Sequence, residues 1–551
     1  DPRGFTWVHG DLNPGNVLAP IEGDGPVFLI DHQPFADSPL VNWLGVGDLA
    51  HAMAVWWPVD ARRALEQSVM ELTDEQRRIV SSRATRLAVQ AGAGAAKTTT
   101  LCAYAQARPR SRVLYVAFNK AIQLEAVARM PANVTARTTH SLAYRKARDL
   151  FGDRAGERIG STYPSAVSRA FGCTPLAATA ALQAIQKWCG SLEAELGSKH
   201  LPVDVASRLP DPAGLVALAR AVWKRMLDAN ERELNLPHDG YLKLYQMEKP
   251  VLRGFDLIAV DEAQDLNPCT FDIVCRQTVP VVMVGDAAQA IYSFRGSTNA
   301  LTLFEADERL PLTRSFRFGR GIAQLANALL GHFKHGFDQP LVGAGAPQRT
   351  RFTVDTSSAF AVIARTNAVV FEEAVAFLDL DRHFHFVGGT EGYKLEKALD
   401  AYRLWVGERG LMRDPYLRSF GSFDELVGLA EASEEPELRQ LVRVVCDYGH
   451  QIPRLIEDIR SRHTDVPKHA WADFDGIYFC TAHKSKGLEF EQVWLADDFM
   501  RFFEDGRELG PDQVEQEEVN ILYVALTRAR AAIRLNESFD DWLRHRRLLP
   551  G

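Results

Sequence analysis

The residues best suited to chemistry follow short apolar runs. Lys97 and Thr98 close the stretch Gly92-Ala-Gly-Ala-Ala-Lys-Thr-Thr99, which comes directly after one such run. Backbone N–H groups of a loop of this kind cradle phosphates at a helix N-terminus. The lysine would reach the β- and γ-phosphates, and the threonine hydroxyl would hold Mg²⁺. The pattern predicts a phosphate-binding loop, with a plain Gly/Ala-rich helix start as the alternative; its residues are Gly92, Ala93, Gly94, Ala95, Ala96, Lys97, Thr98 and Thr99.

Two alanines depart from the usual form of this loop. Ala96 stands where glycine usually precedes the lysine, and Ala91 stands six residues before the lysine. An alanine forced to a positive φ costs about 1 kcal/mol or more, because Cβ crowds the following carbonyl. We expect the loop to accept alanine in a helical conformation, so that Lys97 still reaches the phosphates. If alanine instead strains the loop, nucleotide affinity falls by a factor of about 5–10.

Carboxylates and an amide end two further apolar runs. Asp261 suits a Mg²⁺ ligand, and the adjacent Glu262 suits the residue that orients and deprotonates an attacking water. A solvated acidic turn is the alternative. Gln289 follows the run 281–285, and its amide could sense a γ-phosphate. With the loop, these side chains predict phosphate chemistry on a nucleotide.

Basic side chains form a third group. They are Arg317 in Leu312-Thr-Arg-Ser-Phe-Arg-Phe, Arg528 in Tyr523-Val-Ala-Leu-Thr-Arg, and the run from Thr481 to Phe490. Arginines on a second domain that face a nucleotide held by the first act as arginine fingers, which raise rates by about 10³–10⁵. A surface salt bridge is the more common role of an arginine and remains the alternative.

The elements that position these residues read as two α/β domains. Near-continuous apolar runs at 86–90, 112–118, 256–261 and 281–285 are typical of a parallel sheet, with functional groups at the strands' carboxyl ends. A second set lies at 361–364, 492–495 and 531–535. The predicted organisation is 1–66 as a separate block, 67–144 with 251–310 as the first α/β domain, 145–250 as a helical insertion, 311–390 with 471–540 as the second domain, 391–470 as a small helical insertion, and 541–551 as a tail.

Composition limits the class of protein. The 551 residues exceed what one hydrophobic core usually supports. No apolar run approaches the roughly 18 residues of a membrane span, and no basic-then-apolar leader opens the chain, so we expect a cytoplasmic protein without membrane partners. The net charge of −8 does not exclude a nucleic-acid motor, because a locally positive groove with stacking side chains suffices for single strands.

Taken in order, these segments resemble the UvrD/Rep-type superfamily 1 DNA helicases over about residues 68–540. Within them they are most similar to the F-box DNA helicase group, through Val116-Ala-Phe-Asn-Lys120, Thr138-Thr-His-Ser-Leu-Ala-Tyr144, His238-Asp-Gly-Tyr-Leu-Lys-Leu-Tyr245 and Ser315-Phe-Arg-Phe318. The resemblance implies two RecA-like P-loop NTPase domains that use ATP and Mg²⁺ to move 3′–5′ on single-stranded DNA. It also implies single-strand/duplex junctions as substrates and work in DNA repair or recombination. The chain shows no F-box and no nuclease motif, which puts ubiquitin-ligase partners and strand cleavage in doubt.

The resemblance also assigns roles to single positions. Gln76 would read the adenine edge, Phe316 would stack on its face, Glu489 beside Gly487 would bond the ribose, and Arg317 and Arg528 would be the fingers. Aromatic side chains would grip bases without sequence preference, and Lys484 and Lys486 would hold phosphates. The implied DNA-binding set is Phe118, Asn119, Thr139, His140, Tyr292, Phe294, His483, Lys484 and Lys486.

The N-terminal block carries a different motif. His9-Gly-Asp11-Leu-Asn-Pro-Gly-Asn16, followed by Asp31, resembles the catalytic half of aminoglycoside-phosphotransferase and choline-type kinases. There Asp11 would be the base, and Asn16 and Asp31 would hold Mg²⁺. No glycine-rich loop and no strand lysine precede it, so we interpret it as a catalytically silent kinase-lobe remnant or a truncated fragment of such a lobe. Two other functions stay open: a kinase fused to a DNA-binding module, and a DNA-binding scaffold that does not hydrolyse ATP.

Overall fold

The computed structural model describes residues 72–202, 211–292, 299–393, 395–414, 416–432 and 436–548. The kinase-like residues Asp11, Asn16 and Asp31 and the predicted DNA contact Phe294 lie outside these ranges. The first described helix is α4, Asp74–Ser81. Gln76 caps its start, because its side-chain oxygen accepts from the Thr73 N–H at 2.9 Å while its own N–H donates to the Thr73 hydroxyl at 3.2 Å.

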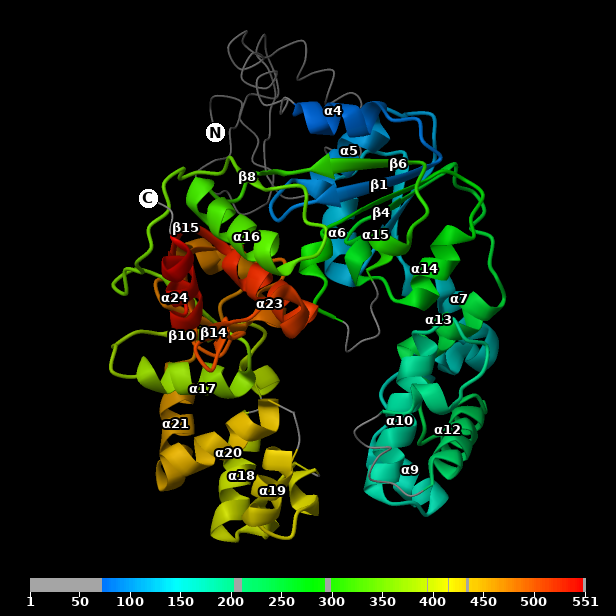
Figure 1. The fold of residues 1–551 in the computed structure, drawn as a ribbon. Helices are drawn as coiled ribbons and strands as arrows, with labels where there is room; N and C mark the ends of the chain where they lie inside the picture. Colours follow the sequence, from blue (N-terminus) through cyan, green and yellow to red (C-terminus); the bar gives the residue numbers. More distant parts are fainter. Residues whose placement is uncertain are drawn as a thin grey trace, which may run out of the picture. The chain divides into compact units, whose positions relative to one another are not determined.

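The first large sheet is parallel throughout and has six strands (Figure 1). Its central strands are fully buried, which explains why they read as continuous apolar runs. The order across the sheet is β3 (Val134–Thr138), β2 (Val113–Ala117), β4 (Leu257–Val260), β5 (Val281–Gly285), β1 (Arg86–Ala91) and β6 (Glu308–Leu312).

Helices cover both faces of this sheet. Alternate residues of β4 enter different cores: Ile258 and Val260 pack in one cluster, Leu257 and Ala259 in the other. The Leu257 face is covered by α5 (Lys97–Gln106) and α6 (Lys120–Arg129). The Ile258 face is covered by α7 (Thr139–Phe151), α13 (His238–Met247), α14 (Pro268–Cys275) and α15 (Ala300–Leu303).

A helical insertion leaves this domain between α7 and α13. It contains α8 (Ala155–Arg158), α9 (Pro164–Phe171), α10 (Pro175–Cys189) and α12 (Pro212–Met226), with short 3₁₀ turns at 152–154 and 198–200. Trp188 of α10 meets Trp223 of α12 edge-to-face at 4.9 Å. The buried Arg158 guanidinium donates to the carbonyls of Leu234, Met226 and Asp228. Since a buried charge needs such partners, Arg158 fixes the loop that leads from α12 toward α13.

The second large sheet has five parallel strands in the order β10 (Phe384–Phe386), β11 (Ile477–Thr481), β9 (Phe360–Ala364), β12 (Phe490–Leu495) and β15 (Ala529–Arg534). One face packs on α16 (Arg320–Phe333), α23 (Gln516–Leu526) and α24 (Glu537–Arg546). Trp542 and Leu543 are fully buried there, so α24 belongs to this core, although the sequence predicted a tail from residue 541. Two further sheets have two strands each: β7 (Arg314–Ser315) with β8 (Val342–Gly343), and β13 (Phe503–Glu504) with β14 (Arg507–Glu508).

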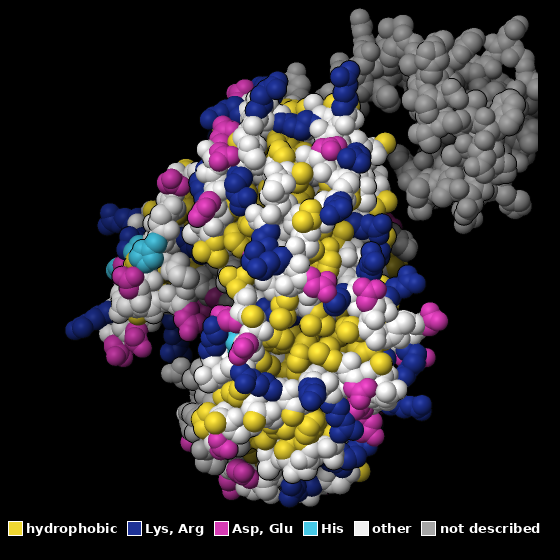
Figure 2. All heavy atoms as spheres, turned by 90° about the vertical axis from the view of Figure 1, so that its right-hand side faces the viewer, with side chains coloured by type: hydrophobic (Ala, Val, Ile, Leu, Met, Phe, Trp, Pro, Cys, Tyr) yellow, Lys and Arg dark blue, Asp and Glu magenta, His cyan; other side chains and the backbone are white. Residues whose placement is uncertain are grey.

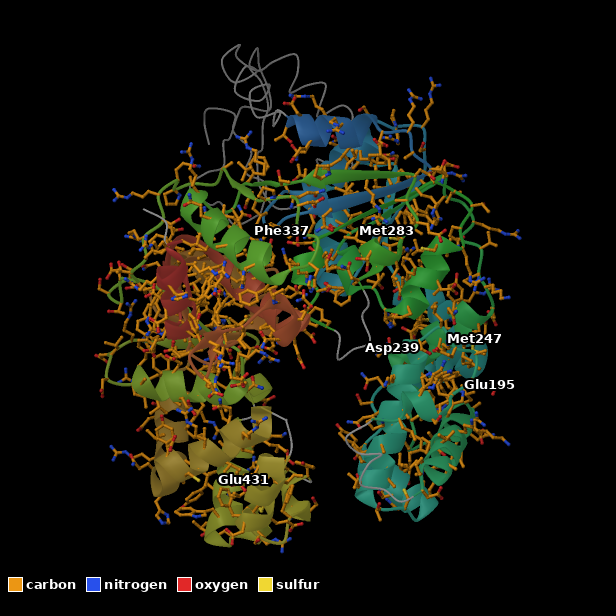
Figure 3. All side chains as sticks on the ribbon, in the orientation of Figure 1. Glu195, Asp239, Met247, Met283, Phe337 and Glu431 are labelled. Carbon is orange, nitrogen blue, oxygen red and sulfur yellow. The ribbon has the colours of Figure 1, made fainter. Side chains whose placement is uncertain are left out.

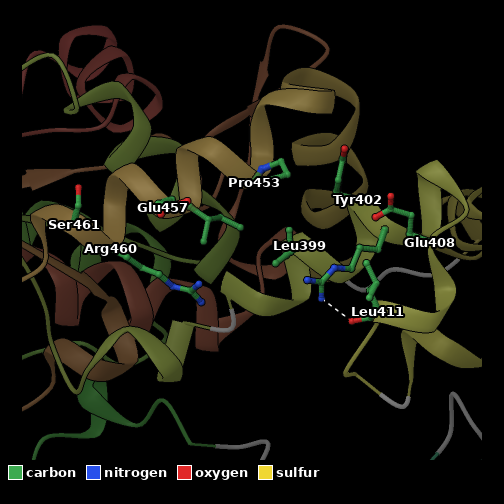
Figure 4. A pocket seen from close by; sticks show the side chains of 10 residues that line it. Leu399, Tyr402, Glu408, Leu411, Pro453, Glu457, Arg460 and Ser461 are labelled. Atoms are coloured by element: carbon green, nitrogen blue, oxygen red, sulfur yellow. Dashed lines mark hydrogen bonds between the residues drawn. The ribbon is translucent and has the colours of Figure 1, made fainter.

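The other face packs on α17 (Asn367–Ala376) and on a second set of helices. These are α18 (Leu395–Val406), α19 (Phe423–Ala432), α20 (Pro436–Tyr448) and α21 (Ile452–Arg462), joined by 3₁₀ turns at 390–393, 409–411, 417–419, 449–451 and 468–473. A cavity of about 740 Å³ opens between α18 and α21 (Figure 4). Arg403 lines it and donates to the Leu411 carbonyl at 2.8 Å.

The structure confirms the predicted α/β class with two parallel sheets and helical insertions. Basic and acidic side chains are interspersed on the face drawn in Figure 2. Among the residues that the structure describes, no helix has both the length and the apolar character that a membrane crossing requires.

Candidate nucleotide and DNA sites

The loop between β1 and α5 has the geometry of a phosphate cradle. It leaves the carboxyl end of β1 and leads into the N-terminus of α5, where free N–H groups and the helix dipole favour anions. Gly94 has φ +71°, and Ala96 has φ 57° and ψ 44°. The expected helical conformation of Ala96 is therefore wrong: the residue is left-handed and stands just before the first turn. This backbone conformation is strained for alanine, because Cβ crowds the following carbonyl.

Residues from the second α/β domain pack closely on this loop. A Cβ on Gly94 would lie 2.5 Å from the Ser315 hydroxyl and 2.7 Å from Cβ of Arg317. The Phe316 N–H donates to the Gly94 carbonyl at 2.9 Å. Ala93, Ala288 and Ile291 also pack within the hydrophobic core of the second domain. The candidate nucleotide site therefore lies where the two sheets' domains meet.

The reactive side chains converge on the start of α5. Lys97 Nζ lies 3.1 Å from Glu262 Oε2, and both side chains are largely buried. The Thr98 hydroxyl donates to Asp261 Oδ2 at 2.9 Å, and the Tyr115 hydroxyl donates to the same oxygen at 2.6 Å. The structure thus brings together four residues predicted from separate motifs, and it adds Tyr115, whose place on an apolar strand gave no signal.

Charge and burial set the protonation of this group. Burial opposes the charge on Lys97, but the carboxylates of Glu262, Asp286 and Asp261 raise its pKa. Burial likewise opposes ionisation of Glu262, yet the charges of Lys97 and Lys486 lower its pKa. Burial and the neighbouring Glu262 raise the pKa of Asp261. The cluster therefore holds Lys97 and Glu262 as an ion pair beside the Asp261 carboxyl group, whose ionisation burial and the charge of Glu262 oppose more strongly than Lys97 favours it.

This last property suits a divalent cation. A Mg²⁺ ion takes one or two protein oxygens together with phosphate oxygens and water. Thr98 Oγ1 and Asp261 Oδ2 supply such a hard-oxygen pair, and they already lie 2.9 Å apart. A bound cation would also offset the burial of the Asp261 carboxylate. The residues present therefore fit the predicted metal.

Glu262 is held in an unusual conformation by its neighbours. Its backbone is left-handed, with φ 50° and ψ 45°, a strained state for a non-glycine residue. The Gln264 amide donates to Glu262 Oε2 at 2.6 Å, while its oxygen accepts from the Asp286 N–H at 2.9 Å. Gln264 thus ties the carboxyl ends of β4 and β5 together and aims the Glu262 carboxylate.

Gln289 reaches this network through Asp286. Its amide donates to Asp286 Oδ2 at 2.7 Å, and the Tyr523 hydroxyl donates to the same oxygen at 3.0 Å. That hydroxyl also accepts from the Ala93 N–H in the phosphate loop at 3.0 Å. Asp286, Tyr523 and Gln264 received no role from the sequence. Asp286 could have been found, because it ends an apolar strand as Asp261 does; Tyr523 could not, because only the folded chain brings α23 to the loop.

The two predicted finger arginines lie on the second domain's side of the loop. Arg317 Nε donates to Glu489 Oε2 at 3.0 Å, and its Nη1 donates to the Thr527 carbonyl at 3.2 Å. Arg528 is fully buried and donates to the carbonyls of Val524 and Leu488 and to the Thr527 hydroxyl. Burial and the nearby Arg317 lower its pKa to about 9. The predicted adenine-stacking Phe316 is 43% exposed, and the predicted ribose contact Glu489 pairs with Arg317.

Several predicted DNA contacts gather at the carboxyl edge of the first sheet. Phe118 and Tyr292 stack with ring centroids 5.9 Å apart and planes inclined by 11°. The His483 imidazole shares a hydrogen bond with the Ile291 carbonyl at 3.0 Å and lies 6.1 Å from the Tyr292 ring. Asn119 caps α6, because its side chain accepts from the Ile122 N–H. Thr139 and His140 open α7, directly after β3.

The two lysines of the basic run make internal contacts. Lys486 Nζ donates to both oxygens of Asp265, at 2.7 and 2.6 Å, and to the Gln289 carbonyl at 2.7 Å. Its side chain is 9% exposed and that of Asp265 2%, so the pair bridges the two α/β domains. Lys484 Nζ lies 3.2 Å from the centroid of the Tyr393 ring. A phosphate contact by Lys486 would require this bridge to open.

Comparison with known proteins agrees with this geometry. The UvrD-like helicase C-terminal domain family matches residues 430–536, and a family described as an AAA domain matches residues 76–295. The F-box DNA helicase 1 of Gallus gallus is 32% identical over 512 residues, which cover 86% of this chain and 50% of that protein. The F-box DNA helicase protein 1 of Schizosaccharomyces pombe is 30% identical, with 86% and 58% covered. The ATP-dependent DNA helicase UvrD2 of Mycobacterium bovis is 24% identical, with 86% and 79% covered. The chain thus spans about half the length of the two F-box helicases it matches.

Proposed function

Since the chain belongs to the UvrD-like helicases, we propose that it hydrolyses ATP to move along single-stranded DNA in the 3′–5′ direction and to separate duplex strands. One observation carries the proposal. The Lys97–Glu262 pair and the Thr98–Asp261 pair lie in the same buried cluster, and residues of a second α/β domain close over it. Catalytic groups at such a junction can convert a chemical step into a change of domain contact.

The roles of the chain's own residues follow from their contacts. Lys97 would exchange Glu262 for the γ-phosphate, which frees the Glu262 carboxylate to orient a water and accept its proton. Thr98 and Asp261 would hold Mg²⁺, which neutralises charge on the phosphates when it is bound. Arg317 and Arg528 would approach the phosphates from the second domain. Arg317 would have to leave Glu489, which is then available to the ribose.

Tyr523 and Lys486 connect the second domain to the nucleotide site. Tyr523 bonds to the phosphate-loop N–H of Ala93, and Lys486 bonds to Asp265, three residues beyond Glu262. A phosphate that competes for the loop N–H groups would alter both contacts. Because Lys486 also lies 4.8 Å from the Tyr292 ring, the same movement would reach the side chains proposed to hold bases. Opening a base pair costs about 1.4 kcal/mol of stacking, which one ATP can supply.

The direction of movement can be tested by strand displacement. We expect a duplex with a 3′ single-stranded tail to be unwound in the presence of ATP and Mg²⁺, and the same duplex with a 5′ tail or with blunt ends to remain intact. Glu262→Gln is the control for the requirement for hydrolysis. Preferred unwinding of the 5′-tailed substrate would overturn the proposed polarity. The proposed role in repair or recombination rests on the kinship alone.

A further inference from the structure

We propose that Tyr144, His238 and His140 form a second stacking platform for bases of single-stranded DNA, on the surface where α7 meets α13. This inference rests on the proposed function. It extends the path of the strand from Phe118 and Tyr292 along α7 toward the helical insertion. Neither Tyr144 nor His238 belongs to the DNA-binding set that the sequence predicted.

The three rings are mounted on one buried tyrosine. The Tyr241 ring, 2% exposed, lies 6.0 Å from His140, 5.9 Å from Tyr144 and 5.9 Å from His238 between centroids. The planes of His140 and Tyr144 stand at 84° and 87° to it, so these two rings meet Tyr241 edge-to-face. Aromatic pairs prefer this arrangement over a face-to-face sandwich. The contacts hold the outer rings in place while leaving part of their surface uncovered.

Hydrogen bonds fix the histidines further. His140 Nε2 lies 2.9 Å from Asp239 Oδ1, and His238 Nδ1 lies 3.4 Å from the Tyr241 hydroxyl oxygen. Asp239 lies at the start of α13 and Met247 at its end, so the platform occupies the Asp239 end of this helix (Figure 3). Because the rings are ordered before a ligand arrives, stacking on them costs little side-chain entropy.

Each of the three rings is partly exposed and can contact a ligand. Tyr144 is 38% exposed, His238 is exposed, and the side chain of His140 is 35% exposed. On α7, His140, Tyr144 and Arg148 are spaced four residues apart and therefore share one face of the helix. Arg148 and its neighbour Arg145 are exposed. The face thus carries two rings followed by a guanidinium group, which can contact the bases and a phosphate of one strand.

The platform is continuous with the proposed DNA edge of the sheet. Strands β2 and β3 pair in parallel with Ala117 opposite Thr138. The next residues, Phe118 and Thr139, therefore leave the sheet at the same level, one strand spacing apart, or about 4.8 Å. His140 follows Thr139 directly, so a strand that stacks on Phe118 can pass to His140 and then to Tyr144 without leaving the surface. This continuity favours a DNA strand over a peptide or a small molecule.

The test measures affinity for single strands with matched variants. Tyr144→Ala and His238→Ala should each weaken binding of a fluorescein-labelled oligo(dT) about fivefold or more, the loss expected for one base stack. Tyr144→Phe keeps the ring and should bind as the unchanged chain does. Tyr163→Ala is the matched control, because Tyr163 is another exposed tyrosine, 72% exposed, and lies in the helical insertion just before α9 rather than on α7 or α13. It should leave affinity unchanged.

The outcomes separate this inference from the proposed function. If the unchanged chain shows no DNA-stimulated ATP hydrolysis, the proposed function fails. If it does, but Tyr144→Ala and His238→Ala bind DNA as tightly as Tyr163→Ala, the platform is refuted and the surface is left to another ligand, such as a peptide. Should Tyr144→Ala lower the melting temperature, Tyr144→Trp decides: a larger ring should tighten binding, and unchanged or weaker binding refutes the platform.

Discussion

Replacing Ala96 with glycine measures the strain that the phosphate loop carries. Ala96 is left-handed, with φ 57° and ψ 44°. A left-handed backbone costs an alanine about 1–2 kcal/mol, and glycine adopts it freely. Glycine also increases the conformational entropy of the unfolded chain, which lowers the free energy of unfolding by about 0.4–1 kcal/mol. We therefore expect Ala96→Gly to raise the free energy of unfolding by about 1 kcal/mol.

The same geometry predicts little change in nucleotide binding. We expect the loop to keep this turn when ATP binds, so relieving the strain stabilises the free and the bound loop equally. The Kd for ATP should therefore change by less than about twofold. A tenfold change would require the substitution to stabilise the free and the bound loop by amounts that differ by about 1.4 kcal/mol. The melting temperature should rise by about 2–4 °C, as 1 kcal/mol does in a domain of this size. Thermal melting and titration with a fluorescent ATP analogue measure the two quantities.

Gly94→Ala is the counterpart. Gly94 also has a positive φ, +71°, but a Cβ there would meet Ser315 and Arg317 of the second domain at under 3 Å. We expect this variant to lose stability and ATP turnover together. The reasoning on Ala96 fails if Ala96→Gly tightens ATP binding fivefold or more without stabilising the fold. It also fails if the unchanged chain hydrolyses no ATP and Ala96→Gly switches hydrolysis on, which would make the chain a DNA-binding scaffold.

Four further variants test other parts of the account. Glu262→Gln should abolish ATP turnover and spare ATP and DNA binding; hydrolysis at the unchanged rate would remove Glu262 from its role. Tyr523→Phe deprives the Ala93 N–H of its acceptor and Asp286 of a donor, so thermal melting should show a loss of about 1–3 kcal/mol and steady-state assays a lower kcat, and full retention of both would contradict the bridge. Phe294→Ala should weaken single-strand affinity by about 1–3 kcal/mol and uncouple ATP use from unwinding. Unchanged DNA affinity together with unchanged unwinding would contradict this role. Burial opposes ionisation of Glu231, but the Glu233 N–H and Arg225 lower its pKa to about 2. Glu231→Gln should therefore destabilise the fold at pH 7 by about 1–3 kcal/mol, as measured by denaturation. This difference between the two proteins should vanish as the pH falls from about 4.5 toward 2, because Glu231 is then protonated.

Sequence reasoning located seven of the eleven strands in the two large sheets, with the residues that follow them, because both signals are local; it missed β3, β6, β10 and β11. A buried parallel strand reads as an unbroken apolar run, as in Leu257–Val260, and the polar residue at its end is next in the chain. The same logic placed Lys97, Asp261 and Gln289 at one edge of the first sheet. The left-handed state of Ala96 escaped prediction, because it depends on how the loop must turn rather than on residue type.

Contacts between the two domains could not be read from the chain. Tyr523 and Ala93 are joined by a hydrogen bond between residues 430 positions apart. Lys486 looks like a phosphate-binding lysine by its neighbours in sequence, yet the fold sets it against Asp265. Asn119 matches a DNA-contact motif and also serves as a helix cap. In each case the local pattern names a residue that can do chemistry, and the tertiary contact decides which partner it meets.

The central claim is that the cluster around Lys97 and Glu262 hydrolyses ATP in response to DNA. The most direct test is the rate of ATP hydrolysis with Mg²⁺, measured with and without single-stranded DNA, for the unchanged chain and for Glu262→Gln. The account predicts slow hydrolysis alone, a rate several-fold higher with single-stranded DNA, and no hydrolysis above background for Glu262→Gln in either condition. Equal rates with and without DNA, or a Glu262→Gln variant that keeps the stimulated rate, would contradict it.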